Sequence, residues 1–393
     1  MAPIKSNNPF ASYFDFFSKS GLDAVNNPVA PQGMTASGGI ISDYEVSGTY
    51  YRAHVFSSSG TFVVSDLGSL GTTVEYLVVA GGGGGGSDSL GSVTGDGRGA
   101  GGGGAGGYRT SMPEGPGGPS PSAESKITVS VASYTITVGG GGNAGRQGST
   151  QGTPGANSYF GPPSAPEGIT SQGGGGGQGQ PSAGHSGGSG GGGAGASPSG
   201  GAGIAGGTGN RQIPNSSTPV PNQGYPGGTG YGFSPDNSGS GGGGGGANAA
   251  GENGSPNTAV SGGGYGGGGK ASVITAGPGS PTTRAGGGAA GNCPDSDHNP
   301  QGGAAGGGTG GDGGSTDPQD QRNGGDGSAT TGGGGGGGGG QAPYPNNVDG
   351  GNGGSGFVAI RYQIGSQQSG TAKATGGSIS YYGGKTIHAF TST

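Results

Sequence analysis

The residues of this sequence that are able to do chemistry are few, and their densest group is a set of oxygen ligands. Asp295, Asp297 and His298 stand close together in a segment without large apolar side chains. Carboxylate oxygens in loops are the ligands that Ca²⁺ prefers. The spacing matches neither an EF-hand loop nor the glycine- and aspartate-rich nonapeptide of calcium-binding β-helices. Two interpretations stay open, solvated acidic loops or a calcium site, and no other cofactor is predicted.

Residues for catalysis are not gathered in any recognisable pattern. Two of the histidines, His54 and His388, occupy equivalent positions of an internal repeat, which favours packing within a strand over a role as base or ligand. Segment 264–271 approaches a phosphate-binding loop, but Lys270 is followed by alanine where that loop needs Ser or Thr. The sequence therefore predicts a protein that is not an enzyme.

Aromatic and amide residues of the polar segments between glycine runs are better candidates for binding. On a rigid base such side chains stack on sugars and hydrogen-bond to hydroxyl groups at low entropic cost. The alternative is that each ring covers a seam between packed glycine segments. Both interpretations stay open for Tyr159, Phe160, Tyr225, Tyr231 and Tyr344.

The composition excludes several classes of protein. With 116 glycines and 27 prolines in 393 residues, the chain lies outside globular usage, yet unbroken glycine runs rule out the G-X-Y period of collagen. A net charge of −6 with 14 scattered Lys and Arg residues predicts no nucleic-acid binding. Apolar runs are too short for membrane insertion, and the first residues lack the pattern of a secretory signal.

The stretch that organises the chain is 75–86, where an apolar strand runs directly into six glycines. One interpretation is a flexible linker, because glycine loses the most backbone entropy on folding. The other is a packed layer of polyglycine-II helices, in which only glycine lets backbones approach closely. Similar junctions recur at Val138–Gly139 and, reversed, at Gly356–Phe357, which favours a scaffold.

Four regions follow from these patterns. Residues 1–33 are predicted to form an anchor, a short helix with a proline-containing linker, whose aromatic face docks on another protein or on this chain. That face consists of Phe10, Tyr13, Phe14, Phe16 and Phe17. Residues 34–80 read as antiparallel strands, and 81–356 as a glycine-rich, polyglycine-II-like domain with variable polar loops. A β insertion at 126–138 reads as a hairpin or one long strand, and 357–393 as a closing strand and a second β copy.

That second copy is an internal repeat. Segments 374–382 and 385–393 parallel 36–44 and 51–59, and the first copy continues into Gly60-Thr-Phe where the second ends. Such a copy presents an edge that pairs within the chain or, by strand exchange, with a neighbouring subunit. The residues expected to take part are Ile379, Tyr381, Ile387 and Phe390.

Four motifs carry a family resemblance: 77–86, 101–109, 134–142 and 353–362, with the lead-in 54–62. Together they resemble the glycine-rich domain of bacteriophage tail-fibre and other virion proteins, and 4–17 is similar to the openings of marine cyanophage structural proteins. The resemblance implies a non-enzymatic fibre or appendage subunit, located on the virion surface and extracellular after host lysis. It would form a homo-oligomer, such as a trimer, contact other virion proteins, and display loops to a host polysaccharide or protein. The alternatives are a capsid decoration fibre and an extracellular filament joined by strand addition.

Overall fold

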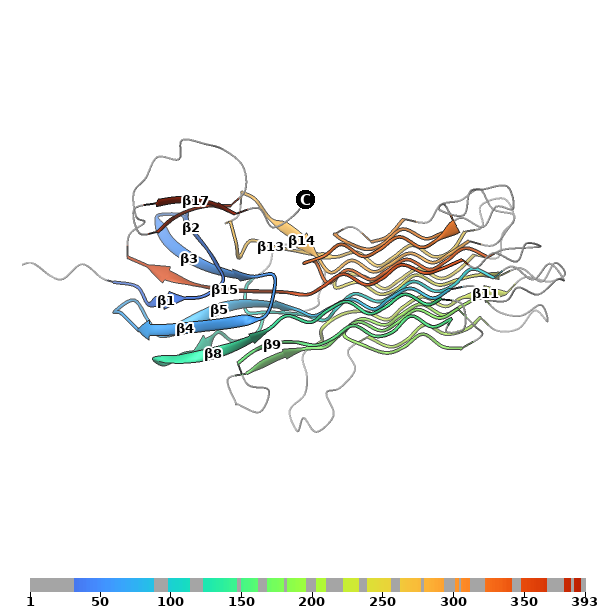
Figure 1. Cartoon of the computed structure of the whole chain (residues 1–393), viewed down its shortest axis with the longest axis horizontal. Coiled ribbons are helices and arrows are strands. Elements are labelled where there is room, and N and C mark those ends of the chain that lie inside the picture. Colours follow the sequence, from blue (N-terminus) through green and yellow to red (C-terminus); the bar gives the residue numbers. More distant parts are fainter. Residues whose placement is uncertain are drawn as a thin grey trace, which may run out of the picture.

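The computed structural model is mostly β, with antiparallel sheets continued by a bundle of extended glycine segments (Figure 1). It describes residues 32–87, 98–113, 123–146, 150–161, 168–179, 182–195, 203–209, 222–232, 239–255, 262–276, 279–292, 301–303, 305–311, 322–340, 348–365, 378–382 and 385–389. The predicted N-terminal helix, with Phe10, Tyr13, Phe14, Phe16 and Phe17, lies outside the described residues. No helix of the described part is long and apolar enough to cross a membrane.

Two sheets form a sandwich at one end of the molecule. The first has the order β2-β3-β15-β5-β6, with β7 pairing the start of β5; its strands are β2 (Ile40–Val46), β3 (Thr49–Phe56), β15 (Phe357–Ile364), β5 (Thr73–Val79), β6 (Tyr108–Thr110) and β7 (Ile127–Thr128). The second has the order β1-β4-β8-β9-β10; its strands are β1 (Thr35–Ser37), β4 (Gly60–Asp66), β8 (Ala132–Thr137), β9 (Ser158–Phe160) and β10 (Ile169–Ser171).

Three two-stranded pairings complete the β structure. Hairpins are formed by β11 (Tyr231–Gly232) with β12 (Gly239–Ser240), β13 (Lys270–Ser272) with β14 (Thr282–Arg284), and β16 (Ser378–Tyr382) with β17 (Lys385–Ala389). The strands predicted between residues 39 and 79, and the one before residue 362, are present as β2 to β5 and β15. The prediction of a hairpin or one long strand at 126–138 is wrong: β7 pairs β5 in the first sheet, whereas β8 pairs β4 in the second.

Alternation along the strands explains the packing of the first sheet. On β15, Val358 and Ile360 face the second sheet, while Phe357 and Ala359 face the opposite side. Successive residues of a strand point to opposite faces, so a strand that is apolar throughout buries both. One core therefore lies between the two sheets. A second lies against the other face of the first sheet, where Ile274 and Ala285 of the glycine-rich region cover it.

His54 sits inside the first core and is fully buried. Its Nδ1 lies 2.6 Å from the carbonyl oxygen of Gly38, its Nε2 lies 3.1 Å from the hydroxyl of Tyr362, and its ring meets Phe62 edge to face. Burial lowers the pKa of His54 to about 4. The predicted packing role of this histidine is confirmed.

Beyond the sandwich the strands continue as extended segments, which we call rods (Figure 1). The pairing of neighbours is preserved across the junction but its period changes. After Val79 pairs with Tyr108, Ala80, Gly83 and Gly86 donate to the carbonyls of Gly107, Gly104 and Gly101. Every third residue thus faces the same neighbour, where in a strand every second residue would.

Each interior rod contacts neighbours on all sides. Rod 81–87 donates N–H groups to rods 150–156, 351–354 and 101–107, and it accepts from rods 174–177, 142–145 and 335–338. These bonds are 2.7 to 3.1 Å long in the central rods, as in good backbone ladders. The rods of the two sheets hydrogen-bond to one another, so the layers that side chains separate in the sandwich meet directly in the bundle.

Glycine is required because the neighbouring backbone occupies the space of a side chain. A Cβ atom at Gly85 would overlap the carbonyl oxygen of Gly336, and one at Gly82 would overlap that of Gly333. A Cβ at Gly140, on an outer rod, would meet nothing within 4 Å. The conformation of Gly85 itself is not the reason, since its φ is not in the left-handed region.

We predict that Gly85→Ala destabilises the fold by about 1–3 kcal/mol or more, because backbone atoms that hold hydrogen bonds cannot move aside. The matched control Gly140→Ala is expected to change stability by less than about 0.5 kcal/mol. Denaturant unfolding followed by circular dichroism measures both. Equal losses for the two variants would contradict a packed bundle.

We also predict a loss of stability in mild acid. Unfolded histidine has a pKa near 6.5. Between pH 6.5 and 4 the unfolded state therefore binds a proton that the buried His54 of the folded state does not bind. The free energy of unfolding decreases as the pH is lowered across this window, by up to about 3 kcal/mol. Above pH 6.5 this contribution is fully present. Unfolding free energies of the parent and of His54→Gln, measured from pH 4 to 8, should differ in slope only within the window; identical slopes would disprove the assignment.

Candidate functional site

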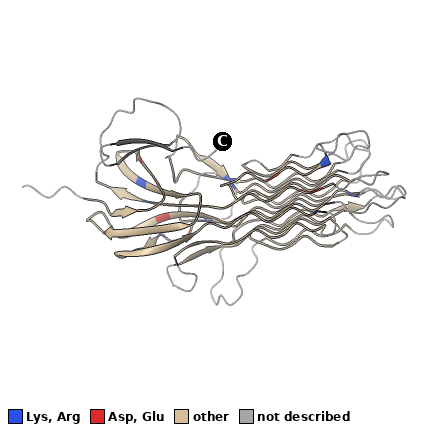
Figure 2. Cartoon of the chain, viewed as in Figure 1, with Lys and Arg blue, Asp and Glu red and all other residues tan. Residues whose placement is uncertain are grey.

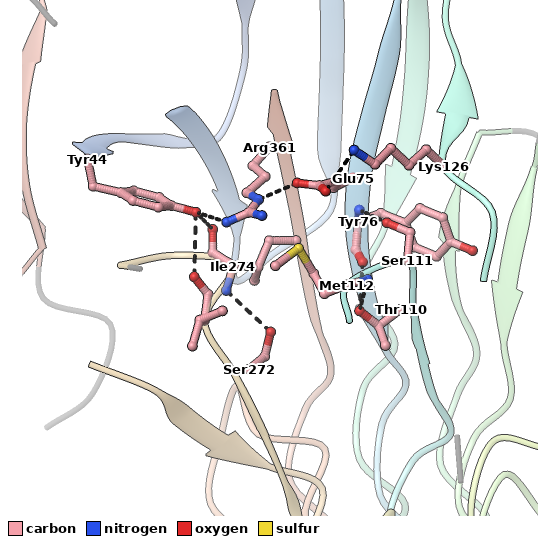
Figure 3. A network of polar contacts seen from close by, with 11 residues as sticks. Tyr44, Glu75, Tyr76, Thr110, Ser111, Met112, Lys126, Ser272, Ile274 and Arg361 are labelled. Carbon is pink, nitrogen blue, oxygen red and sulfur yellow. Dashed lines mark hydrogen bonds and ion pairs between the residues drawn. The ribbon is translucent and has the colours of Figure 1, made fainter. Parts of the chain in front are cut away.

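A buried polar network joins the sandwich to the glycine-rich region (Figure 3). Arg361 of β15 donates from Nε to Glu75 of β5 at 2.5 Å and from Nη1 to the hydroxyl of Tyr44 on β2 at 2.8 Å. Lys126 approaches the other oxygen of Glu75 at 3.0 Å. Arg361 also lies over the ring of Tyr51, 4.4 Å from its centre. Both carboxylate oxygens and the guanidinium are thus paired.

The network reaches across to the hairpin β13–β14. The Tyr44 hydroxyl donates to the carbonyl of Ile274 at 2.7 Å, and Ser272 receives the N–H of Ile274 at 3.3 Å (Figure 3). On the other strand of that hairpin, Arg284 lies over the ring of Phe357 at 3.8 Å. These contacts fix the hairpin on the outer face of the first sheet.

The electrostatics of this network suit a structural role. Burial raises the pKa of Tyr44 despite the opposing effect of Arg361, so the phenol is neutral and free to donate. Burial opposes the ionisation of Glu75, but hydrogen bonds and attraction from Arg361 and Lys126 outweigh it and lower its pKa. Glu75 and Arg361 are paired with other members of the network. The arrangement locks elements together.

Polar side chains within the rod bundle replace missing neighbours. At the outer rods, amide and hydroxyl oxygens accept backbone N–H groups that no further rod could take, as Asn253 does for Thr229 at 2.8 Å and Asn352 does for Ala144 at 3.0 Å. Backbone N–H groups are likewise accepted by the side chains of Thr153, Asn157, Ser186, Asn323 and Ser355, by the carboxylate of Asp326 and, inside the bundle, by the buried Asn292. These oxygens satisfy the bundle and are used within it.

Charged groups are rare on the rods, as Figure 2 shows, and several of them mark the end far from the sandwich. Several rods end at the far end of the bundle, namely 81–87, 172–179 and 285–292. Two others, 98–107 and 322–328, begin there. Arg98 and Arg322 are buried, whereas Arg146 is exposed and faces Asp349 at 3.9 Å. The segments that connect these rods start and finish at this end, which makes the far end the candidate binding site.

The far end also holds buried donors. Ser87, Gln178 and Asn292 are at most 1% exposed. Within the described residues, the Ser87 hydroxyl, Gln178 Nε2 and Asn292 Nδ2 have no hydrogen-bond partner. Buried polar groups are normally paired, with protein or with water. This level of the bundle therefore has donor capacity to spare for water or for oxygen atoms of a ligand.

Of the five aromatic residues predicted to bind, the four that the structure describes are not brought together. Phe160 is buried in the core beside Phe62 and Tyr134, so it is not available to a surface partner, and that prediction is corrected. Tyr159 is half-buried in β9, at the sandwich. Tyr225 is half-buried within rod 222–230, in line with Tyr231, which is 37% exposed on β11 at the far end. Tyr344 lies outside the described residues.

The remaining predicted positions divide between the described and undescribed parts of the chain. Ile379, Tyr381 and Ile387 lie on the β16–β17 hairpin; Phe390 lies outside the described residues, as do Asp295, Asp297 and His298. Among the described residues no group of His, Cys, Asp and Glu is placed to hold a metal ion. In segment 264–271 the N–H groups of Gly264 and Gly267 are bonded to rod 241–244, so they do not form a phosphate loop.

The architecture is that of a β-sandwich whose strands extend into a glycine rod bundle. The sequence matches the family model of the glycine-rich domain over residues 57–363. The chain therefore belongs to the glycine-rich domain family. No curated protein matches the sequence.

The polar network around Glu75 and Arg361 was not predicted from the sequence, although the sequence contains a pattern that indicates it. Glu75 and Arg361 each interrupt an otherwise apolar strand, and two opposite charges in such settings predict a buried pair. The roles of the asparagines left no comparable signal, because their partners are backbone groups of rods far away in the chain.

We predict that Glu75→Gln destabilises the protein by about 3 kcal/mol or more, because the buried Arg361 charge loses its partner. The double variant Glu75→Gln/Arg361→Met should lose less than the sum of the single variants, since it removes both charges. Urea unfolding of the parent, of Glu75→Gln, of Arg361→Met and of the double variant completes the double-mutant cycle. Additive losses would show that the two groups do not interact.

Proposed function

We propose that the rods are polyglycine-II helices. Such helices have three residues per turn, no internal hydrogen bonds and close approach at glycine. The three-residue period of the hydrogen bonds, and the presence of acceptors and donors on six sides of rod 81–87, support this assignment. A bundle bonded in this way is rigid along its length and across it.

We propose further that the protein is a structural subunit of a phage virion, a fibre or appendage that displays loops for adhesion to a host surface. The observation that carries this proposal is the repeated return of the rods to one end, away from the sandwich (Figure 1). The rod ends that these segments connect lie together in a rigid bundle, a base on which variable loops are able to bind without loss of the fold. The family match supports the glycine-rich domain, and the sequence resemblance supplies the link to phage.

In this proposal each part has a task. The aromatic face of the N-terminal anchor (Phe10, Tyr13, Phe14, Phe16, Phe17) docks on other virion proteins. The segments at the far end, with Tyr231 and Tyr344, contact a host polysaccharide or protein. In the calcium interpretation, an ion bound near Asp295, Asp297 and His298 stabilises one of these segments. Several copies in one homo-oligomer raise avidity without a strong single site. The protein would be located on the virion surface.

Loop exchange tests the adhesion proposal. Replacing 233–238 and 341–347 by Gly-Ser segments of equal length leaves the rods unchanged, and it should reduce retention of the fluorescently labelled chain on marine cyanobacterial cells by about tenfold, since avidity amplifies the loss of weak contacts. The control replaces 162–167, which joins β9 and β10 at the sandwich. Retention that is equal in the two variants, or absent from all cells tested, would contradict the proposal.

Hydrogen exchange tests the rod assignment independently. We expect the amides of 81–86 and 101–107 to be protected as strongly as those of β5 and β15, because their N–H groups are bonded within the bundle. Mass spectrometry of proteolytic fragments after exchange for seconds to hours gives the comparison. Complete exchange of these segments within seconds would show that they are unfolded.

A further inference from the structure

The C-terminal hairpin is a structural copy of the hairpin β2–β3. In the hairpin β2–β3, Ile41 lies opposite His54 and Ser42 lies opposite Ala53. In the C-terminal hairpin β16–β17, Ile379 lies opposite His388 and Ser380 lies opposite Ile387. These are the positions that the sequence repeat equates, so the duplicated sequence has kept the pairing register.

The two copies differ in what lies beyond them. Strand β3 uses both edges, since it pairs with β2 on one side and with β15 on the other. Strand β17, the equivalent of β3, pairs with β16, and the described part of the chain offers it no strand on its second edge. Strand β16 lies next to β2, which leaves β17 on the outside (Figure 1).

The outer strands of the two large sheets in the described residues are protected. Strands β1, β6 and β10 are three residues long, and the pairing of β1 contains an irregularity after Thr35. Strand β2 is long, but it carries Asp43 and Glu45 and has β16 beside it. Strand β17 has five residues, Lys385–Ala389, without proline, glycine or an acidic residue. Short edges and charges prevent strand addition, and β17 has little of either protection.

We propose that the edge of β17 pairs antiparallel with β17 of a second copy, about a twofold axis that passes beside Ile387. In this register Ile387 faces the partner's Ile387, Thr386 faces the partner's His388, and Lys385 faces the partner's Ala389. The centre is apolar and β-branched, and the two lysines lie at opposite ends. Antiparallel pairing of a strand with itself is isologous, so each copy gives and receives the same contacts.

This interface goes beyond the proposed adhesive function and does not depend on it. The two hairpins would form a four-stranded sheet that joins two sandwiches and leaves both rod bundles free. An isologous contact closes after two copies, whereas an open filament requires a head-to-tail contact. The hairpin therefore builds a dimer and not a strand-addition polymer.

Charge-pair rescue tests the register. The parent chain is expected to sediment as a dimer, and Ile387→Lys and Ile387→Glu, each alone, should weaken dimerisation by about tenfold or more, because like charges then face each other at the axis. An equimolar mixture of the two variants should dimerise again. Rescue excludes misfolding as the cause. A monomeric parent, or single variants that dimerise as the parent does, would overturn the proposal.

A cysteine at the axis gives a second measurement. In a Cys293→Ser background, Ile387→Cys should form a disulfide-linked dimer under mild oxidation, visible on a non-reducing gel. The matched control is Thr386→Cys, whose equivalent in the partner lies too far along the strand for a disulfide. Equal cross-linking at the two positions, or none at Ile387→Cys, would show that the strands do not pair in this register.

Discussion

The structure depends on one constraint: in the rod bundle a backbone carbonyl stands where a side chain would begin. In an ordinary sandwich, side chains hold two sheets about 10 Å apart and the apolar core fills the gap. Past Val79 and Val138 the side chains disappear, and the rods of the two sheets come within hydrogen-bonding distance of each other. A hydrophobic core is thus replaced by a network of backbone hydrogen bonds, which keeps the neighbours within each sheet and adds new ones from the other layer.

This exchange explains why the sandwich and the bundle require each other. A glycine rod has a large entropic cost and no apolar surface, so it cannot select its neighbours alone. The strands do so: β5 lies between β15 and β6, and rod 81–87 then lies beside the rods that lead to the same two strands. The buried pair of Glu75 and Arg361 sits in these central strands, near the point where the pattern of neighbours is set. Its role fits specification of register, since buried pairs contribute little net stability but penalise wrong partners.

Local patterns predicted the strands and the junctions well, because alternation and β-branched residues act over a few positions. Segments 49–56, 60–64 and 74–79 were predicted this way. Sheet order was beyond reach, since β15 pairs with β3 across some 300 residues and nothing local records that partner. The same limit explains the errors at 126–138 and at Phe160. The alternation at 126–138 was real but served two different sheets, and the ring of Phe160, an aromatic in a polar segment, packs in a core whose other residues lie far away in the chain. Glycine runs alone could not separate a linker from a packed bundle, because both need the same residue for opposite reasons.

The bundle also limits where binding can take place. Along its sides, outward N–H groups are taken by Asn253, Asn352 and similar side chains, which act as substitutes for a rod that is not there. An oxygen that accepts a backbone N–H has less capacity left for a sugar hydroxyl, and a satisfied side presents few free groups to another bundle. Polar residues that look like binding residues in the sequence are thus part of the scaffold. Both proposed contacts therefore lie where the pattern of neighbours ends, at the far end of the rods and at the outer edge of β17. The proposed adhesion would use rod ends held on a rigid base, whereas the proposed dimer would use one strand with a single register.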